Sequence, residues 1–110
     1  MSQLVRVNLG GEGEVPGVLN QQPPFALLPS WRSQSGKTVA ELQAAGIPML
    51  IAPNDRLPFA NDSVDEVITN NVPVDRLAAY GPGVQSSEIR RILKPGGRWV
   101  HDRRVRYVKP

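Results

Sequence analysis

Cysteine is absent from the 110-residue chain, and histidine occurs once, at His101. Without cysteine there is no disulfide, no thiolate zinc site and no cysteine nucleophile. A single histidine among scattered acidic residues does not supply the converging ligands of a metal site, so we expect no bound metal. No apolar run approaches the roughly 18 residues of a membrane span, and residues 1–6 lack the layout of a signal peptide. We therefore expect a soluble, cytoplasmic protein.

Aromatic residues are also scarce, at 5% of the chain, which is too few for a typical binder of single-stranded nucleic acid. We expect Trp99 to pack within a sheet and Trp31 to cover a sheet edge. Hydrophobic residues make up 40% and charged residues 21%, as in folded domains rather than disordered segments. The length predicts one domain over residues 1–110 and excludes separate cofactor and substrate lobes.

Positive charge is concentrated at the C-terminal end of the sequence. Eight of the 13 Lys and Arg residues lie between residues 90 and 110, where Asp102 is the only acidic residue. Such a cluster attracts phosphates or acidic partners, although a solvated surface explains it equally well. If the cluster binds a partner, we expect nucleic acid or an acidic protein to contact Arg90, Arg91, Arg103, Arg104 and Arg106.

Hydrophobic periodicity predicts an alternation of strands and helices. A capping box at Thr38–Glu41 begins one helix, which Gly46 closes in a left-handed conformation. A second helix over residues 86–93 ends at Pro95-Gly96-Gly97, and residues 20–36 read as a loop because of their prolines. Strands are expected over residues 4–9, 48–52, 64–70 and 98–108. This order is typical of an α/β fold with a single small, open, mostly parallel sheet.

Two segments resemble consecutive blocks of class I S-adenosylmethionine-dependent methyltransferases. Residues 57–72, LPFANDSVDEVITNNV, are similar to the turn and fourth strand of that family, and residues 88–100, EIRRILKPGGRWV, to its next helix and fifth strand. Upstream, VNLGGEG at 7–13 and PGVLN at 16–20 are similar to its glycine loop and second strand. The resemblance implies a Rossmann-like sheet of the methyltransferase type, here without the family's usual terminal extensions.

The resemblance also implies S-adenosylmethionine as cofactor and a set of residues around it. Gly10, Gly11 and Gly13 would cradle the methionine part, while Glu12 stands in place of the family's second glycine and could bind the amino group. Gln22 replaces the acid that holds the ribose, and Asp55 is the acid nearest to the adenine position. Asn70 and Asn71 would face the methyl acceptor, for which the basic segment suggests nucleic acid.

The physical chemistry of the residues agrees with such a site. A strand that ends in glycines lets the backbone approach a ligand closely, because no Cβ intervenes. Ligands of open α/β sheets lie beyond the carboxyl ends of the strands, near the point where the strand order reverses. The glycines, the Asn54–Asp55 pair and the Asn70–Asn71 pair all follow predicted strands, so one edge of the sheet would gather them.

A second hypothesis keeps the fold and drops methyl transfer. The chain would then be a toxin or effector domain, such as the C-terminal module of a larger secreted bacterial protein, that has lost the cofactor and binds or cleaves RNA. His101 would act as the base and Arg103 or Arg104 would stabilise the phosphorane. A third hypothesis, a binding module without catalysis, requires only the basic face.

Overall fold

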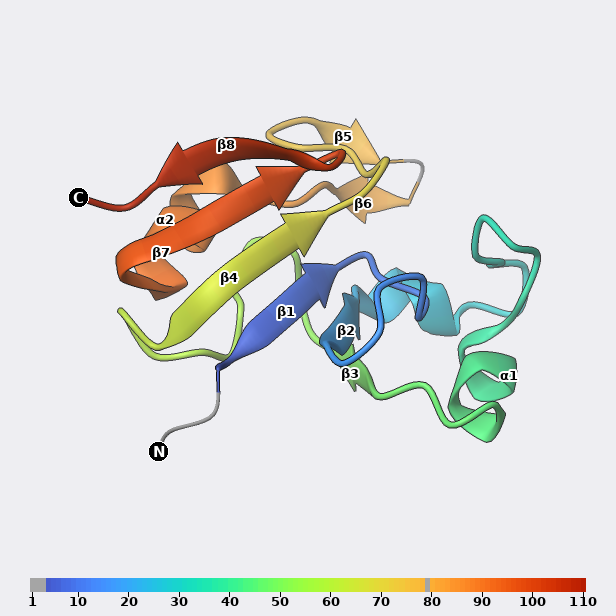
Figure 1. Ribbon diagram of the computed structural model, residues 1–110. Helices are drawn as coiled ribbons and strands as arrows, with labels where there is room; N and C mark the ends of the chain where they lie inside the picture. Colours follow the sequence, from blue (N-terminus) through green and yellow to red (C-terminus); the bar gives the residue numbers. More distant parts are fainter. Residues whose placement is uncertain (1–3, 79) are drawn as a thin grey trace.

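The computed structural model describes residues 4–78 and 80–110, and Figure 1 shows its elements. Within these residues the main sheet has six strands, and a two-stranded hairpin lies beside it. The main strands are β1 (Arg6–Leu9), β2 (Leu19–Gln22), β3 (Met49–Ile51), β4 (Val64–Thr69), β7 (Leu93–His101) and β8 (Arg104–Val108). The hairpin and helices are β5 (Leu77–Ala78), β6 (Gly81–Pro82), the 3₁₀ helix η1 (Pro24–Leu27), α1 (Val39–Ala44) and α2 (Ser86–Ile92).

The sheet has the order β3-β2-β1-β4-β7-β8. All neighbours pair in parallel except β8, which is antiparallel to β7. The fold is therefore the expected small α/β fold with a mostly parallel sheet. Strands β1 to β3 progress toward one edge and β4, β7 and β8 toward the other, so the order reverses between β1 and β4. This reversal is the topological switch point at which open α/β sheets bind ligands.

Helix α2 covers one face of the sheet and closes the apolar core. Its Ile89 and Ile92 are fully buried, in one cluster with Val67 of β4 and Trp99 of β7. In Figure 1, α2 lies behind β7. The prediction that Trp99 packs within the sheet is confirmed. Burial of these side chains is the main stabilising contribution in this half of the molecule.

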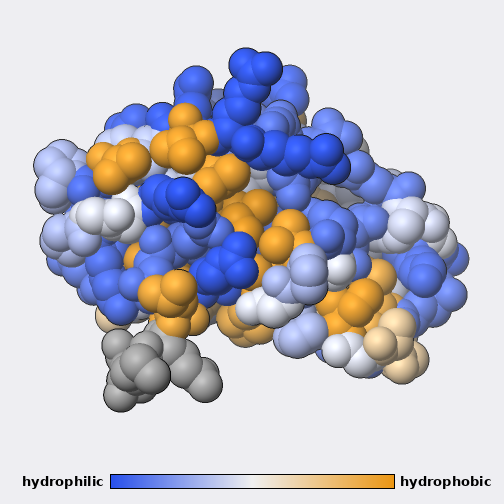
Figure 2. Space-filling model, viewed as in Figure 1, coloured by the Kyte–Doolittle hydropathy of each residue, from blue (hydrophilic) through white to orange (hydrophobic). Residues whose placement is uncertain are grey.

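The opposite face carries charged side chains instead of a helix over β1, β4 and β7, as far as the described residues go. Glu66 points there because side chains alternate along a strand and the next residue, Val67, belongs to the core. Its carboxylate pairs with Arg6 at 2.9 Å and with Arg98 at 2.6 Å, across both neighbouring strands. Burial raises the pKa of Glu66, but hydrogen bonds from Arg98 and Arg6 outweigh it and hold the pKa below its ordinary value. Figure 2 shows hydrophilic and hydrophobic residues interspersed on this face.

Local signals placed the helix ends correctly. Thr38 accepts a hydrogen bond from the Glu41 amide, and the Glu41 side chain accepts one from the Thr38 amide, so the capping box is confirmed. Gly46 has a φ of 83°, as expected for a left-handed residue after α1. Helix α2 ends at Ile92, before the Pro-Gly-Gly sequence, and β7 begins at once.

Two strand predictions were wrong. Residues 98–108 are not one strand but the ends of a hairpin, whose turn residues Asp102 and Arg103 have φ of 47° and 70°. Arginine rarely adopts positive φ, and the Asp-Arg pair lacks the glycine that marks most two-residue hairpin turns. The second strand was expected over residues 16–20 but lies at 19–22, so residues 20–22 are not part of the expected loop; their polar side chains are buried and hydrogen bonded.

Candidate functional site

A cavity of about 500 Å³ lies at the topological switch point, and we call it the switch-point cavity. Each of the first four parallel strands contributes a residue to it: Gly10 follows β1, Gln22 ends β2, Asn54 follows β3 and Val72 follows β4. The remaining lining residues are Pro23, Phe25, Ser30, Trp31, Arg32, Pro73, Ala78, Tyr80 and Val84. This volume is within the range of cavities that bind small ligands and cofactors.

The backbone at Gly10 fits its surroundings only without a side chain. Its φ is +70°, and a Cβ added there would lie 2.5 Å from Cγ1 of Val72. The Gly10 amide donates to the backbone oxygen of Gln21 at 2.7 Å and to its Oε1 at 3.1 Å. Glycine is therefore required where the loop after β1 meets the segment after β4.

Buried amide side chains build the wall of the cavity along β2. Gln22 Nε2 donates to the Gly11 carbonyl at 3.1 Å. Gln21 Nε2 donates to the Ala52 carbonyl at 2.8 Å and to Asn54 Oδ1 at 3.0 Å, while Asn54 Nδ2 donates to the Pro82 carbonyl at 2.8 Å. These bonds fix the positions of Gln22 and Asn54 before any ligand arrives.

The residue that follows β3 at this cavity is Asn54, the first member of the Asn54–Asp55 pair expected at this edge of the sheet. Asp55, to which the resemblance gave the adenine, is exposed and does not line the cavity, whereas Asn54 is buried in its wall. The signal for Asn54 in the sequence is that it is the first polar residue after the apolar run of β3. The structure thus places an amide, rather than a carboxylate, where the family resemblance implies contact with adenine.

A smaller cavity of about 140 Å³ adjoins the loop after β1, and we call it the acidic cavity. Its lining residues are Gly10, Glu12, Glu14, Gln34, Asn70 and Asn71. The Glu12 carboxylate accepts from the amides of Gln34 at 3.0 Å and Ser35 at 3.1 Å, and Glu14 accepts from Asn70 Nδ2 at 3.1 Å. Burial raises the pKa of Glu14, but hydrogen bonds from Asn8, the Glu12 amide and Asn70 outweigh it and keep this carboxyl ionised at neutral pH.

Gly10 belongs to both cavities, whereas Gly11 and Gly13 line neither. Gly11 is packed against Asn8 and Asn20, since an added Cβ would lie 2.3 Å from Asn20 Oδ1. Gly13 has a φ of +90° and packs against Ile47. Of the predicted cofactor residues, the structure therefore brings together Gly10, Glu12 and Gln22, with Asn70 and Asn71 beside them.

A third cavity, of about 490 Å³, lies between α2, the β7–β8 hairpin and the segment after β4. We call it the arginine cavity, because Arg76, Arg90 and Arg106 line it together with His101. The other lining residues are Val72, Val74, Asp75, Ser86, Trp99 and Tyr107. Val72 lines this cavity and the switch-point cavity, so the two are neighbours.

His101 lies between Thr69 and Asp102. Thr69 Oγ1 accepts from Trp99 Nε1 at 2.8 Å and shares a hydrogen bond of 2.7 Å with His101 Nδ1, while His101 Nε2 lies 3.3 Å from Asp102 Oδ2. These contacts orient the imidazole toward the arginine cavity, which His101 lines. The nuclease hypothesis stays a prediction.

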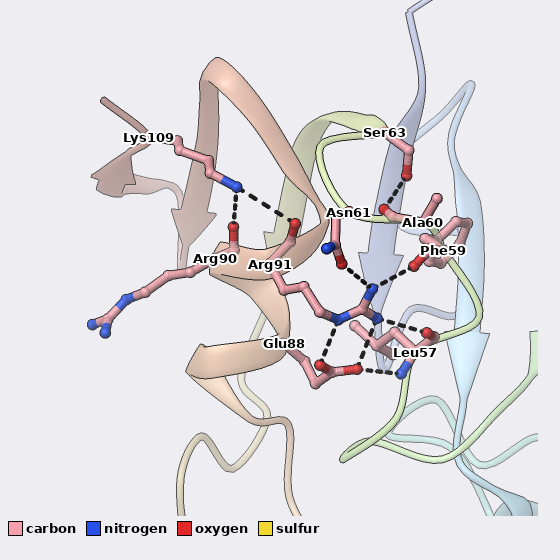
Figure 3. A network of polar contacts seen from close by, with 9 residues as sticks. All are labelled: Leu57, Phe59, Ala60, Asn61, Ser63, Glu88, Arg90, Arg91 and Lys109. Carbon is pink, nitrogen blue, oxygen red and sulfur yellow. Dashed lines mark hydrogen bonds and ion pairs between the residues drawn. The ribbon is translucent and has the colours of Figure 1, made fainter.

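The arginines predicted to bind nucleic acid occupy different environments. Arg90 and Arg106 line the arginine cavity, whereas Arg103 and Arg104 lie at the hairpin turn and do not. Arg91 is part of the fold: it pairs with Glu88 at 2.7 Å and donates to the carbonyls of Leu57, Phe59 and to Asn61 (Figure 3). Its guanidinium nitrogens are all engaged by the protein.

Other cations of the basic segment are also paired. Lys94 pairs with Asp65 and Arg98 with Glu66, while Lys109 pairs with Asp62 and donates to the Arg90 carbonyl. Together with Arg91, four of the eight basic residues after residue 89 form ion pairs. The basic face suggested by the sequence therefore reduces to Arg90, Arg103, Arg104 and Arg106, which form no ion pair with a described residue.

Neither a membrane span nor a metal cluster is found in the part of the chain that the structure describes. No helix there has the length and apolar character needed to cross a bilayer. No group of three His, Asp or Glu side chains converges there in the manner of a metal site.

Comparison with known proteins gives a structural likeness but no family assignment. No protein-family model and no curated protein sequence matches the chain. A solved structure that matches is the complex between the Haloferax volcanii Trm112 methyltransferase activator and its candidate methyltransferase, with 26% sequence identity and a TM-score of 0.50. The match covers 88% of this chain and 43% of that one, so the chain spans less than half the length of its neighbour. The chain therefore has a methyltransferase-like fold.

Proposed function

We propose that the chain is a compact methyltransferase-type domain that binds S-adenosylmethionine at the switch-point cavity. The observation that carries this proposal is the position of Gly10, whose backbone reaches the cavity floor at the reversal of strand order. The structural likeness to a candidate methyltransferase supports it.

The residues around the two adjoining cavities fit the parts of this cofactor. Phe25, Trp31 and Tyr80 offer aromatic surfaces to the adenine, and the buried amides of Gln22 and Asn54 offer hydrogen bonds to the ribose and base. The methionine part carries an ammonium group and a sulfonium, for which the carboxylates of the acidic cavity are suitable partners. We therefore assign Gln22 to the ribose, Asn54 rather than Asp55 to the adenine, and Glu12 with Glu14 to the cationic end.

When bound, the cofactor supplies an electrophilic methyl group. The contribution of the chain is to hold the donor and an acceptor in line and to exclude water between them. Asn70 and Asn71 follow β4 beside Gly10 and would position the acceptor. A nucleic-acid acceptor stays a prediction. The neighbour was solved with an activator protein, which supports the expectation that this chain also has a protein partner.

The test is a titration of S-adenosylmethionine into the isotope-labelled chain, followed by NMR. We expect saturable shifts at the indole N–H of Trp31 and at the amides of Gly10 and Gln22. In Gly10→Ala the shifts should vanish, because the new Cβ meets Val72 and displaces the loop. Gly17→Ala is the matched control, since Gly17 has a φ of +76° but no atom within 4 Å of an added Cβ.

Equal binding by wild type and Gly10→Ala would place the cofactor elsewhere. An absence of shifts in the wild type at millimolar cofactor would contradict the proposal as a whole. Gly17→Ala shares the strain of a left-handed alanine, so any loss that it also shows must be assigned to backbone strain rather than to the cavity.

A further inference from the structure

The arginine cavity combines a strong excess of positive charge with a concave shape. Three guanidinium groups and one imidazole line it, against one carboxylate, Asp75. That carboxylate is already satisfied, because Asp75 accepts from the Ser86 amide at 2.8 Å and from the Ser86 hydroxyl at 2.6 Å. These two hydrogen bonds, followed by the charges of Arg90 and Arg106, hold the pKa of Asp75 below its ordinary value.

The three cavity arginines differ from the paired arginines elsewhere in the molecule. Arg6, Arg91 and Arg98 each lie within 3.0 Å of a glutamate oxygen. Arg76, Arg90 and Arg106 form no ion pair with any residue that the structure describes. Three guanidinium groups opposed by the single carboxylate of Asp75 leave an excess of positive charge, which favours an anion beside them.

Aromatic rings hold two of these guanidinium groups in place. The Arg90 guanidinium lies 5.4 Å from the centroid of the Tyr107 ring, and that of Arg106 lies 5.9 Å from the centroid of the Trp99 ring. Contact with a ring face restricts the side chain while its N–H edges stay available for hydrogen bonds. The arrangement is thus ordered in advance, which lowers the entropic cost of binding an anion.

We propose that the arginine cavity binds a phosphate ester of mononucleotide size through Arg76, Arg90 and Arg106. Guanidinium groups match the oxygens of phosphate, since they donate paired N–H bonds in a fixed geometry. The cavity volume of about 490 Å³ suits a small ligand, and its three arginines, all exposed, line the same cavity. The proposal does not depend on cofactor binding. If S-adenosylmethionine occupies the neighbouring cavity, the phosphate ester lies on the other side of Val72 and is the candidate acceptor, a role that rests on the proposed function.

The two tryptophans of the chain allow the two cavities to be tested separately. Trp31 lines the switch-point cavity and Trp99 lines the arginine cavity, and the sequence contains no other tryptophan. In the labelled 110-residue chain their indole N–H signals can be assigned with Trp31→Phe. Adenosine 5′-monophosphate, inorganic phosphate and uncharged adenosine are then titrated at low ionic strength in the absence of S-adenosylmethionine.

We expect the monophosphate to shift the Trp99 signal with saturation, inorganic phosphate to bind the same site, and adenosine to leave the signal unchanged. Arg90→Gln and Arg106→Gln should each weaken monophosphate binding by about tenfold or more, because each removes a charge-assisted hydrogen bond. Arg56→Gln is the matched control, an exposed arginine that lines none of the three cavities, and should leave the affinity unchanged.

An unchanged Trp99 signal, or equal affinity for adenosine and its monophosphate, overturns the proposal. A single-stranded oligonucleotide that binds much more tightly than the monophosphate, and loses affinity in Arg104→Gln rather than in Arg90→Gln, overturns it in favour of an extended nucleic-acid surface. Failure of the proposed function would instead leave Trp31 unmoved by S-adenosylmethionine, whatever Trp99 shows.

Discussion

The two halves of the sheet are built from different chemistry. Around β4, β7 and α2 most of the fully buried side chains are apolar, among them Ile89, Ile92 and Leu93, with Thr69 as a polar exception. Around β2 and the turn after β3 they are amides, with Asn20, Gln21, Gln22 and Asn54 all buried. We call these the apolar half and the amide half. Apolar burial stabilises without fixing direction, whereas a buried amide network fixes positions. The amide half is where the switch-point cavity lies.

The amide half carries a cost in stability. Asn8 is fully buried, and its Oδ1 has no hydrogen-bond partner among the described residues. A buried polar atom without a partner destabilises a fold by about 1–3 kcal/mol. Conflict between local stability and a positioned site is typical of functional regions. The difference between the halves is therefore itself an argument for a binding role of the amide half.

The largest loss of stability is expected from a substitution that leaves a cavity in the apolar half. Ile92→Ala should lower the free energy of unfolding by about 3 kcal/mol, because Ile92 is fully buried and α2 cannot collapse onto the space. Denaturant unfolding measures this, with Leu27→Ala as control, since Leu27 is 61% exposed and its loss should change little. If both variants lost the same free energy of unfolding, apolar burial would not be what stabilises the apolar half.

A somewhat smaller effect is expected from the ion pair in Figure 3, which braces the apolar half. Arg91→Gln should cost about 2 kcal/mol at neutral pH, because Glu88 and the Leu57 and Phe59 carbonyls lose their donor. Hydrogen bonds from Arg91 lower the pKa of Glu88 below its ordinary value of 4.5. The unfolded chain therefore takes up the proton first as the pH falls, and this part of the stability is present above pH 4.5 and is lost below it.

Unfolding measured between pH 7 and pH 3 should show this loss in the wild type. The same scan on Arg91→Gln should be flatter, since Glu88 then loses the largest cause of its lowered pKa. A variant as steep as the wild type would mean that the other ion-paired carboxylates, such as Glu66 and Asp65, account for the whole dependence.

The smallest effect is expected in the amide half. Asn20→Ala leaves the Gly13 amide and the Pro48 carbonyl without their side-chain partner, at a cost of about 1.5 kcal/mol. The variant should weaken S-adenosylmethionine binding more than Ile92→Ala does, because Asn20 packs against the loop that carries Gly10 and Gly11. Calorimetry of both variants would sharpen the comparison. If Ile92→Ala weakened cofactor binding more than Asn20→Ala, the amide half would have no special role in binding.

The sequence predicted those parts of the molecule that depend on local signals. The capping box at Thr38, the left-handed Gly46 and the apolar stripe of α2 each rest on residues within one helix. The burial of Gln21 and Gln22 could not be predicted in this way, because their hydrogen-bond partners lie at Asn54 and Gly11, outside β2. A polar stretch whose hydrogen-bond partners lie elsewhere in the sequence is therefore predicted as a loop.

The candidate site was predicted in outline rather than in detail. The family resemblance led to Gly10 and Gln22, and both line the switch-point cavity. The adenine role was given to Asp55 instead of its neighbour Asn54 because the resemblance directs attention to an acid, and the role of Arg91 was missed because charge counts do not reveal pairing. The arginine cavity depends on the hairpin turn at Asp102–Arg103, which returns Arg106 to the Trp99 ring.

The position of β1 at the centre of the sheet has a consequence for how the chain is made. Arg6 pairs with Glu66, a partner 60 residues further along the chain. During synthesis β1 leaves the ribosome before β4, so one edge of β1 stays bare until β4 has emerged. Contacts of such long sequence separation also form slowly, because a large loop must close first. While β1, β2 and β3 can pair in the order of translation, the nascent sheet therefore keeps an open strand edge until β4 closes it.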